Sequence, residues 1–310
     1  MKTAAVLPAL GIGDALLMMI ASHQLKNKGY RVTTFHNALP ELSSWLPGHD
    51  LQSLPPQEQL IEALSPFDLI LVENDNSPII KRLIDAYRSR LSIFYPTYLA
   101  TKHAPLSSLD RTFDKDLPMA DNITKTIASL INQSFPCKEN GLFPPHPLSH
   151  RGKKNQVVLH PASRSPAKNW KASGFLKVAH QLRAKGFTPL FCVGPHERHD
   201  WTFVEKEKFT LADLPTLSHL AEVVYESGYV IGNDSLIGHL ASNLKVPTVI
   251  IANDEKRMRL WRPGWQKGQL VLPPCYLPNW KFLRLKDHHW QHFITPHQVL
   301  RHFEKLTRML

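Results

Sequence analysis

Residues 229–244 constrain the fold of this chain more than any other segment. The β-branched pair Val230 and Ile231 is followed by the polar run 232–235, and leucines then recur every fourth residue, as in a helix. A strand that leads directly into a helix is the building unit of an open α/β sheet. Ligands of such sheets bind outside the carboxyl ends of the strands. The segment therefore predicts both a parallel sheet and a ligand site.

The turn between this strand and helix carries side chains that suit an anionic ligand. Asp234 or Ser235 can cap the helix, and His239 lies four residues after Ser235, on the same helical face. The start of a helix presents unpaired N–H groups and a partial positive charge, which favour an anion. An alternative is that Asp234 is only a helix cap and His239 only a packed core histidine.

The same strand and helix pattern occurs in both halves of the chain. Residues 2–8 and 30–36 are expected strands that flank a helix at 14–28, and the second half begins with a strand at 156–160. Between the halves, residues 136–154 are rich in Pro and Gly, as linkers are. The pattern predicts an α/β protein with two Rossmann-like domains, 1–150 and 151–310, that face one another across a cleft.

Other expected elements complete the two domains. The expected strands are 50–54, 67–72, 91–95, 187–193 and 246–252, and the expected helices are 57–64, 78–90, 119–135, 171–185, 196–207, 217–227 and 296–309. Residues 96–118 are expected to be irregular. The basic stretch 256–262 is expected to rim the cleft, face an acidic surface or lie on a solvated face.

The charge of the chain indicates an acidic partner. The formal net charge is +11 and the pI is near 9.6, which suits nucleic acid, an anionic membrane surface or a phosphorylated substrate. A solvated basic face without a partner is the alternative. Zinc-finger spacing, an aromatic RNA-binding motif and an Arg/Gly-rich tail are all missing from the sequence, which argues against nucleic acid.

The cysteines predict a reducing compartment. Cys137, Cys192 and Cys275 are far apart, odd in number and without the spacing of metal ligands. The sequence also contains no recognisable signal peptide and no apolar run of about twenty residues, the length a membrane span needs. A cytoplasmic location is therefore expected.

The turn after the first strand contains Gly11, Gly13 and Asp14. The glycines suit close approach of a ligand to the backbone, but a third glycine is missing. His36 and Asn37 stand where a dinucleotide-binding strand ends in an acidic residue, which argues against a nicotinamide or flavin enzyme. Asp14 is a candidate general base, or else a simple helix cap.

The loop after the strand 156–160 carries hydroxyl groups and cations. Ser163, Arg164 and Lys168 are the residue types that hold a diphosphate through charge-assisted hydrogen bonds. The alternative is a solvated loop in which Trp170 packs against the following helix.

The sequence also has neighbouring histidines at 288, 289 and 292, but carboxylates with matching spacing are missing, so no metal site is expected.

Three motifs together resemble glycosyltransferase family 9. They are Gly11-x-Gly13-Asp14 in the first half, Ser163-Arg164 followed by Lys168-x-Trp170, and Gly232-Asn233-Asp234-Ser235 followed by His239. The family contains the heptosyltransferases of lipopolysaccharide core synthesis, which have the two-domain GT-B architecture. The resemblance covers most of the chain, and its most specific motifs lie in the second half.

The resemblance implies a reaction and a set of roles. It implies an inverting, metal-independent transfer of heptose from ADP-heptose, with no further cofactor, to an acidic, lipid-linked saccharide at the inner membrane face. In this scheme Asp14 is the catalytic base, and Gly11 and Gly13 form the turn on the acceptor side. Donor-binding residues would be Ser163, Arg164 and Lys168 for the diphosphate, and Asp234, Ser235, Gly238 and His239 for the sugar and phosphates.

Two departures from the family pattern fall on the donor side. Leu236 stands where the family has a glycine after Asp-Ser, and Asn253-Asp254-Glu255 stand where it has Phe-Gly-Pro. A leucine can fill space that the donor needs, or forbid a turn with positive φ. The open alternatives are an altered donor, a non-catalytic binding or scaffold protein, a nucleotide-sugar 2-epimerase, and nucleic-acid binding.

Overall fold

The computed structural model of the chain describes residues 1–274 and 289–309, and these form two compact units. Unit 1 is Met1–Phe143 and unit 2 is Pro144–Leu310, so the division falls inside the Pro-rich segment 136–154. Cys275 and His288 lie outside the described residues. Each unit has its own parallel sheet with helices on both faces.

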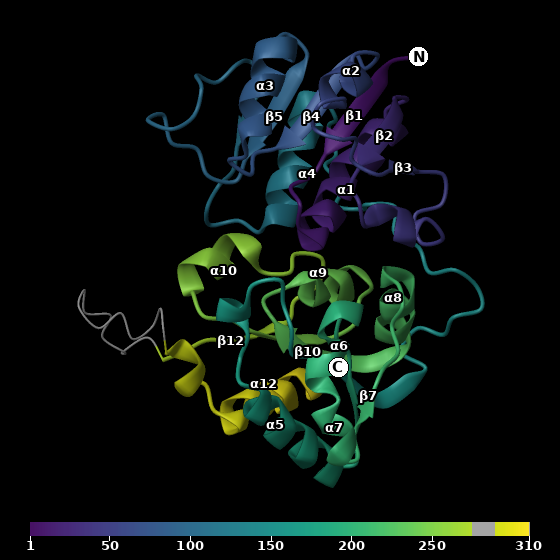
Figure 1. Ribbon diagram of the computed structural model, residues 1–310, viewed down its shortest axis with the longest axis vertical. Helices are drawn as coiled ribbons and strands as arrows, with labels where there is room; N and C mark the ends of the chain where they lie inside the picture. The colour runs from purple at the N-terminus through teal and green to yellow at the C-terminus, as the bar shows by residue number, and fades with distance from the viewer. Residues whose placement is uncertain (275–288, 310) are drawn as a thin grey trace. The chain divides into compact units, whose positions relative to one another are not determined.

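Unit 1 contains a six-stranded parallel sheet with the strand order β3-β2-β1-β4-β5-β6 (Figure 1). The strands are β1 (Thr3–Leu7), β2 (Arg31–Phe35), β3 (Asp50–Gln52), β4 (Leu69–Glu73), β5 (Leu91–Tyr95) and β6 (Arg111–Thr112). The chain winds outward from β1 in one direction and from β4 in the other. The strand order therefore reverses between β1 and β4, which leaves a crevice at their carboxyl ends.

Helices cover both faces of this sheet. They are α1 (Ile12–Asn27), the 3-10 helix η1 (Leu39–Leu42), α2 (Leu60–Leu64), α3 (Pro78–Tyr87) and α4 (Met119–Leu130). Ala5, Ile70 and Ile93 share one apolar core with residues of α2 and α3. Because side chains alternate along a strand, Ala4 and Val6 face the opposite side, where α1 packs on β1 and on α4.

Unit 2 repeats this plan with the strand order β12-β11-β10-β7-β8-β9, again all parallel. The strands are β7 (Lys153–His160), β8 (Thr188–Phe191), β9 (Thr210–Leu211), β10 (Ser227–Asn233), β11 (Thr248–Ile251) and β12 (Gln269–Val271). Here the order reverses between β7 and β10, which are paired so that Gly232 lies beside His160. The crevice of this sheet therefore opens after residues 160 and 233.

The helices of unit 2 also lie on two faces. They are η2 (Pro166–Lys168), α5 (Ala172–Ala184), η3 (Pro195–Glu197), α6 (Arg198–Trp201), α7 (Phe203–Lys206), α8 (Leu217–Glu226), α9 (Leu236–Asn243), α10 (Glu255–Trp261), η4 (Trp290–His292) and α12 (Pro296–Thr307). Helices α5 and α12 lie side by side and share the large core of one face (Figure 1). Helices α8 and α9 contact each other and the strand β10.

The structure corrects several expectations about local structure. The short strands β6, β9 and β12 were not expected, because two or three residues are too few to show an alternating pattern. The expected helix at 196–207 is divided into η3, α6 and α7, and the basic stretch after residue 254 forms the helix α10. Across residues 1–274 and 289–309, no helix has the length and apolar character that a membrane span requires.

Candidate functional site

The crevice of unit 2 brings together the two loops that the sequence singled out. The loop 161–170 follows β7, and the turn at Asp234 follows β10, its neighbour in the sheet. Asn233, the last residue of β10, joins them with both ends of its buried amide. Its Oδ1 accepts a hydrogen bond from the backbone N–H of Trp170 at 3.0 Å, and its Nδ2 donates to the backbone oxygen of Pro161 at 2.6 Å.

Asp234 lies at the centre of a charged cluster. One of its carboxylate oxygens, Oδ2, accepts hydrogen bonds from Lys168 Nζ and from Arg257 Nε, each at 3.2 Å. The Asp234 side chain is 8% exposed, whereas those of Lys168 and Arg257 are 27% and 39% exposed. The two cations can therefore contact a ligand from solvent while they remain paired with Asp234.

Two residues, Asp234 and Ser235, were expected as possible caps of α9. Ser235, not Asp234, occupies the N-cap position, and its side chain makes no capping hydrogen bond. The carboxylate of Asp234 pairs instead with Lys168 and Arg257, because two nearby cations stabilise it more than a single backbone N–H does. Among the residues that the structure describes, Ser235 Oγ has no hydrogen-bond partner although it is buried. A hydroxyl at this place can bind a ligand.

His239 lies one turn into α9 and is buried. Burial lowers its pKa to about 4; Asp234 opposes this shift, and Lys168 and Arg257 add to it. The imidazole is therefore neutral near pH 7. Its Nδ1 is a second buried atom without a hydrogen-bond partner within the described part of the chain. The interpretation of His239 as only a packed core histidine does not account for this unpaired nitrogen, because buried polar groups are normally paired.

Gly238 and Leu236 of α9 are explained by packing and by backbone conformation, respectively. A Cβ at Gly238 would lie 2.8 Å from Ile250 Cδ1 and 3.0 Å from Pro263 Cγ, so this glycine lets α9 pack closely against its neighbours. Leu236 is the first residue of α9, and its φ is not positive. The leucine at this position therefore causes none of the backbone strain that a left-handed turn would impose.

The predicted residues of the loop after β7 differ in their surroundings. The hydroxyl oxygen of Ser163 lies 2.6 Å from Asn169 Oδ1 and 2.9 Å from the backbone oxygen of Ser165, and its one proton is shared between these two acceptors, so it helps to shape the loop. Arg164 is exposed, whereas Lys168 reaches Asp234. The ring of Trp170 packs against Phe175 of the following helix α5, as the alternative interpretation of this loop expected.

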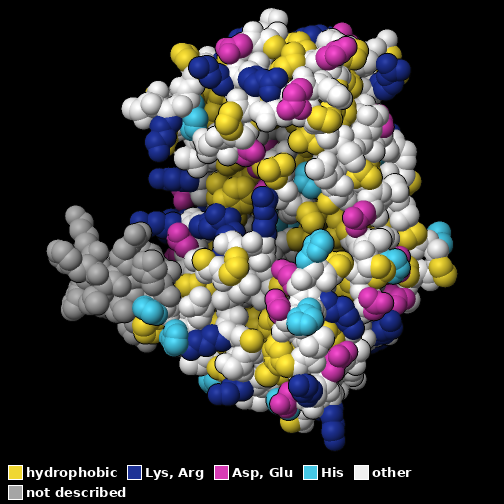
Figure 2. Space-filling view, viewed as in Figure 1, with side chains coloured by type: hydrophobic (Ala, Val, Ile, Leu, Met, Phe, Trp, Pro, Cys, Tyr) yellow, Lys and Arg dark blue, Asp and Glu magenta, His cyan; other side chains and the backbone are white. Residues whose placement is uncertain are grey.

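Arg257, the second cation in the cluster at Asp234, comes from the basic stretch 256–262, which was expected to rim the cleft, face an acidic surface or lie on a solvated face. Asp254 caps α10 by accepting hydrogen bonds from the backbone N–H groups of Lys256 and Arg257, at 2.8 and 3.3 Å. Figure 2 shows Lys and Arg side chains gathered over α10. Lys256 and Arg259 are exposed there, but Arg257 reaches Asp234. The capping residue Asp254 before a run of helix-forming residues was the sequence signal for this helix.

The crevice of unit 1 contains Gly11, Gly13 and Asp14. Gly11 is the N-cap of α1, which begins two residues earlier than expected, so Gly13 and Asp14 belong to its first turn. The carboxylate of Asp14 lies over Gly11, where a Cβ would be 2.3 Å from Asp14 Oδ2. A glycine at position 11 therefore makes room for the side chain that is the candidate base.

Glu73 is a buried carboxyl group that sequence reasoning missed. It ends β4, the strand next to β1, and is 2% exposed. Its Oε2 accepts a hydrogen bond from the backbone N–H of Ala9 at 3.2 Å. Burial, and then the nearby charge of Asp14, raise the pKa of Glu73 well above its usual range. An acidic residue at the end of an apolar strand was the available signal.

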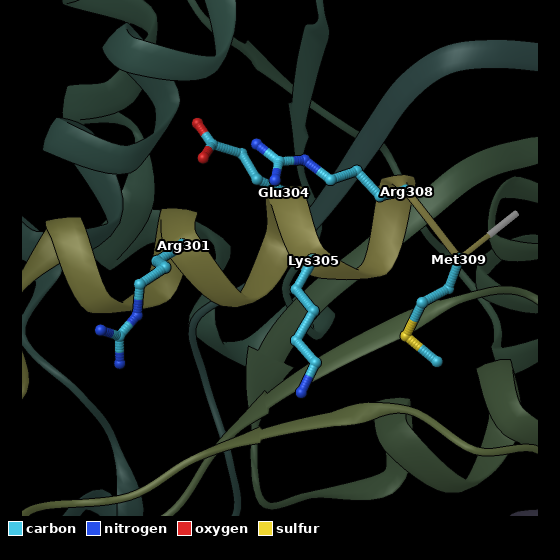
Figure 3. A pocket seen from close by; sticks show the side chains of 5 residues that line it. All are labelled: Arg301, Glu304, Lys305, Arg308 and Met309. Carbon is cyan, nitrogen blue, oxygen red and sulfur yellow. The ribbon is translucent and has the colours of Figure 1, made fainter.

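A shallow hollow on α12 does not include any predicted site residue. It is lined by Arg301, Glu304, Lys305, Arg308 and Met309 (Figure 3). All five belong to one helical face or its end, and Glu304 is paired with Lys185 at 2.8 Å. The same part of the chain, residues 1–274 and 289–309, contains no cluster of three or more His, Cys, Asp or Glu side chains able to hold a metal ion.

Comparisons with known proteins define the class. A glycosyl transferase family 9 structure from Veillonella parvula is 16% identical, with a TM-score of 0.72, and covers 100% of this chain and 98% of that chain. E. coli ADP-heptose lps heptosyltransferase II is 16% identical, with a TM-score of 0.71 and coverage of 100% and 99%. E. coli heptosyltransferase WaaC with ADP-2-deoxy-2-fluoro heptose is 14% identical, with a TM-score of 0.72 and coverage of 98% and 99%.

The two parallel six-stranded sheets with their helices thus match the GT-B fold of heptosyltransferase structures, as the sequence predicted. The model of glycosyltransferase family 9 (heptosyltransferase) matches residues 109–267, about half of the chain. The chain belongs to this family. A comparison with curated protein sequences found no match.

Proposed function

We propose that this protein is an inverting heptosyltransferase that takes its sugar from ADP-heptose. The observation that carries the proposal is the cluster at the start of α9, where Lys168 pairs with Asp234 beside Ser235 Oγ and His239 Nδ1, two buried atoms that have no hydrogen-bond partner among the described residues. A cation, a hydroxyl, an imidazole and the N–H groups of a helix start are suited to a sugar diphosphate. ADP-heptose is supported by family membership and by the E. coli neighbours of the fold.

On the donor side, each residue receives a role from its chemistry. Lys168 and Arg164 bind the diphosphate, and Lys168 stabilises the negative charge that develops as the nucleoside diphosphate leaves. Ser163 contributes its hydroxyl group. Ser235 and His239 bind the phosphates and sugar at the start of α9, and Gly238 lets that helix pack closely against its neighbours. These side chains and backbone groups supply the charge stabilisation, so the proposed reaction uses no metal ion or other cofactor.

On the acceptor side, Asp14 is the proposed general base. The acceptor hydroxyl oxygen attacks the anomeric carbon of heptose while Asp14 takes its proton, and the bond from that carbon to the diphosphate oxygen breaks. Attack from the face opposite the leaving group inverts the anomeric configuration. Gly11 leaves space for the Asp14 side chain, and Gly13 lies with it in the first turn of α1.

The proposed acceptor is an acidic, lipid-linked saccharide such as the lipopolysaccharide core. The net charge of +11 favours attraction to an anionic membrane surface. We therefore propose a cytoplasmic protein that binds peripherally at the inner membrane face. Vesicles that contain anionic lipids should bind the protein at low salt and release it at high salt, whereas neutral vesicles should not bind it.

The deciding experiment is a calorimetric titration with ADP, UDP, GDP and their sugars. ADP should bind selectively, and Lys168→Ala should weaken ADP binding by about tenfold or more, the worth of a hydrogen bond to a charged group. Lys177→Ala is the matched control, because Lys177 is an exposed lysine of α5 away from the cluster. This control should bind ADP like the wild type.

Other outcomes select among the alternatives. Selective binding of UDP or GDP would keep the transferase and replace the donor. Conversion of a nucleotide sugar without an acceptor would indicate an epimerase. If none of the nucleotides binds, the protein is a non-catalytic member of the family, and Leu236→Gly tests whether the leucine alone blocks the donor.

A further inference from the structure

We infer that Arg257 binds the donor diphosphate together with Lys168, and that Asp234 holds both cations in position before the donor arrives. The inference rests on the proposed function and adds a residue that the family motifs do not contain. Arg257 lies on α10, two residues after the last residue of the segment 253–255 that departs from the family pattern.

The geometry of the cluster supports a role toward a ligand. Arg257 uses Nε to bond Asp234 Oδ2, and its guanidinium group has further N–H donors. At 39% exposure its side chain is only partly covered. Lys168 bonds the same oxygen and is 27% exposed. Two cations and one carboxylate leave the cluster with a net charge of about +1, since His239 is neutral.

Arg257 is held at this place by its own helix. Its guanidinium carbon lies 5.3 Å from the centre of the Trp261 ring, one helical turn further along α10. Asp254 fixes the start of this helix through its capping hydrogen bonds. These contacts restrict the long side chain before a ligand binds, so less entropy is lost on binding.

The chemistry of the leaving group explains why a second cation is useful. A nucleoside diphosphate gains negative charge when its bond to the sugar breaks, and one lysine neutralises only part of it. The planar guanidinium group can donate two parallel hydrogen bonds to phosphate oxygens, which a lysine cannot do. The N-terminal end of α9 lies at the same cluster, as do the buried atoms Ser235 Oγ and His239 Nδ1, which residues 1–274 and 289–309 leave without a hydrogen-bond partner. The helix α10, which begins within the segment that departs from the family pattern, therefore offers a second phosphate ligand.

The competing explanation is that Arg257 only neutralises Asp234. The experiment that separates the two is a titration of ADP and inorganic pyrophosphate into the wild type, Arg257→Ala, Arg257→Lys, Lys256→Ala and Lys168→Ala. Lys256 is exposed and precedes Arg257 on the same helix, so its variant removes the same charge from the same surface. Pyrophosphate tests the contact with the diphosphate without any contribution from the adenosine of ADP. Thermal unfolding of each variant establishes that it is folded at the titration temperature.

Arg257→Ala should weaken both ligands by about 10- to 100-fold, as expected for loss of a charged hydrogen-bond donor. Arg257→Lys should recover part of this affinity, and Lys256→Ala should change it by less than about threefold, as expected for a screened surface charge. If Arg257→Ala binds like Lys256→Ala while Lys168→Ala has lost affinity, the inference is wrong and the proposed donor site stands. If the wild type binds neither ligand, or Lys168→Ala binds both like the wild type, the proposed donor site fails, and the inference fails with it.

Discussion

The side-chain oxygen of Asn233 accepts a hydrogen bond from the backbone N–H of Trp170 at 3.0 Å. This contact joins the end of β10 to the end of the loop that carries Lys168. The ring of Trp170 in turn donates from Nε1 to the backbone oxygen of Ile294 at 3.1 Å and is buried. The position of Lys168 beside Asp234 therefore depends on a neutral amide that has no contact with solvent.

Asn233→Ala should lower the stability of unit 2. The change leaves the N–H of Trp170 and the backbone oxygen of Pro161 without their partner in a buried place, at a cost of about 1–3 kcal/mol for each group. Urea unfolding followed by tryptophan fluorescence measures the loss. Asn155→Ala, at an exposed position of β7, should stay within about 0.5 kcal/mol of the wild type. Equal stability of the two variants would show that Asn233 does not hold the loop.

Asp14→Asn should remove transfer activity and leave donor binding intact. An asparagine keeps the size of the side chain but cannot accept the acceptor proton, and a general base contributes about 10²- to 10⁴-fold to the rate. A coupled assay of ADP release with a lipid-linked saccharide acceptor gives the rate, and calorimetry gives the ADP affinity. Activity within about tenfold of the wild type would reject Asp14 as the base.

Glu73→Gln should make unit 1 more stable, and by more as the pH rises. The pKa of Glu73 is raised in the folded state, so the unfolded chain loses this proton at a lower pH than the folded chain does. Between the two pKa values stability therefore falls as pH rises, and above both the full penalty of a buried charge remains. Glutamine has no proton to lose. Thermal unfolding of both proteins at pH 5 and pH 8 tests this, and a difference that is the same at both pH values would contradict it.

His23 and His49 should make unit 1 sensitive to acid. Their ring nitrogens Nδ1 and Nε2 lie 3.2 Å apart, and burial, followed by Lys26 and His23, lowers the pKa of His49 to about 4. In the unfolded chain His49 binds a proton near pH 6.5, whereas in the folded protein it stays neutral down to about pH 4. The stabilisation by neutral His49 is therefore complete above pH 6.5 and is lost as the pH falls toward 4.

His49→Gln should reduce this loss by about 1 kcal/mol after allowance for screening by solvent, since His49 is only partly buried. Unfolding in urea at pH 7 and pH 4.5 measures it. His219→Gln, which changes a histidine of unit 2 at the exposed start of α8, serves as the control. An unchanged acid response in the His49 variant would show that this histidine pair does not cause the sensitivity.

Gly238→Ala should lower stability rather than donor affinity. The added methyl group meets the flexible end of Ile250 and the ring of Pro263, and relief of such crowding costs about 1–3 kcal/mol. ADP titration of the folded variant should give an affinity within about threefold of the wild type. A larger loss of affinity with unchanged stability would show that Gly238 contacts the donor, as the family motif implies.

Much of the fold could be predicted from the sequence, because local patterns of apolar and polar residues indicate strands and helices. Strands β1, β2, β4, β5, β7 and β10 were expected within a few residues, since each has a buried apolar run followed by glycine or polar residues. The helices α1 and α9 were marked by the spacing of their apolar residues, and α5 by the glycine that follows it. The family motifs then indicated the class, and the fold comparison and the family match agree with it.

The short strands at the edges of both sheets could not be predicted in the same way. Strands β6, β9 and β12 contain two, two and three residues. Such strands exist because the neighbouring strand offers free hydrogen-bonding groups, so their cause lies in another part of the chain. The same reason explains why Asp234, one of the two candidate caps, is not the N-cap of α9. Asp234 has a capping side chain by local rules, but Lys168 and Arg257 lie far from it in sequence.

The sequence by itself determined the α/β class, the family motifs and the residues Lys168, Asp234 and Asp14 as candidates, because these depend on periods and spacings within short segments. Only the tertiary structure decided that Arg257 joins Lys168 at Asp234 and that Glu73 lies buried near Asp14. Both relationships arise where parallel strands reverse their order and bring distant loops together. The energy of a charge there depends on its neighbours in space and on burial, which no local pattern encodes.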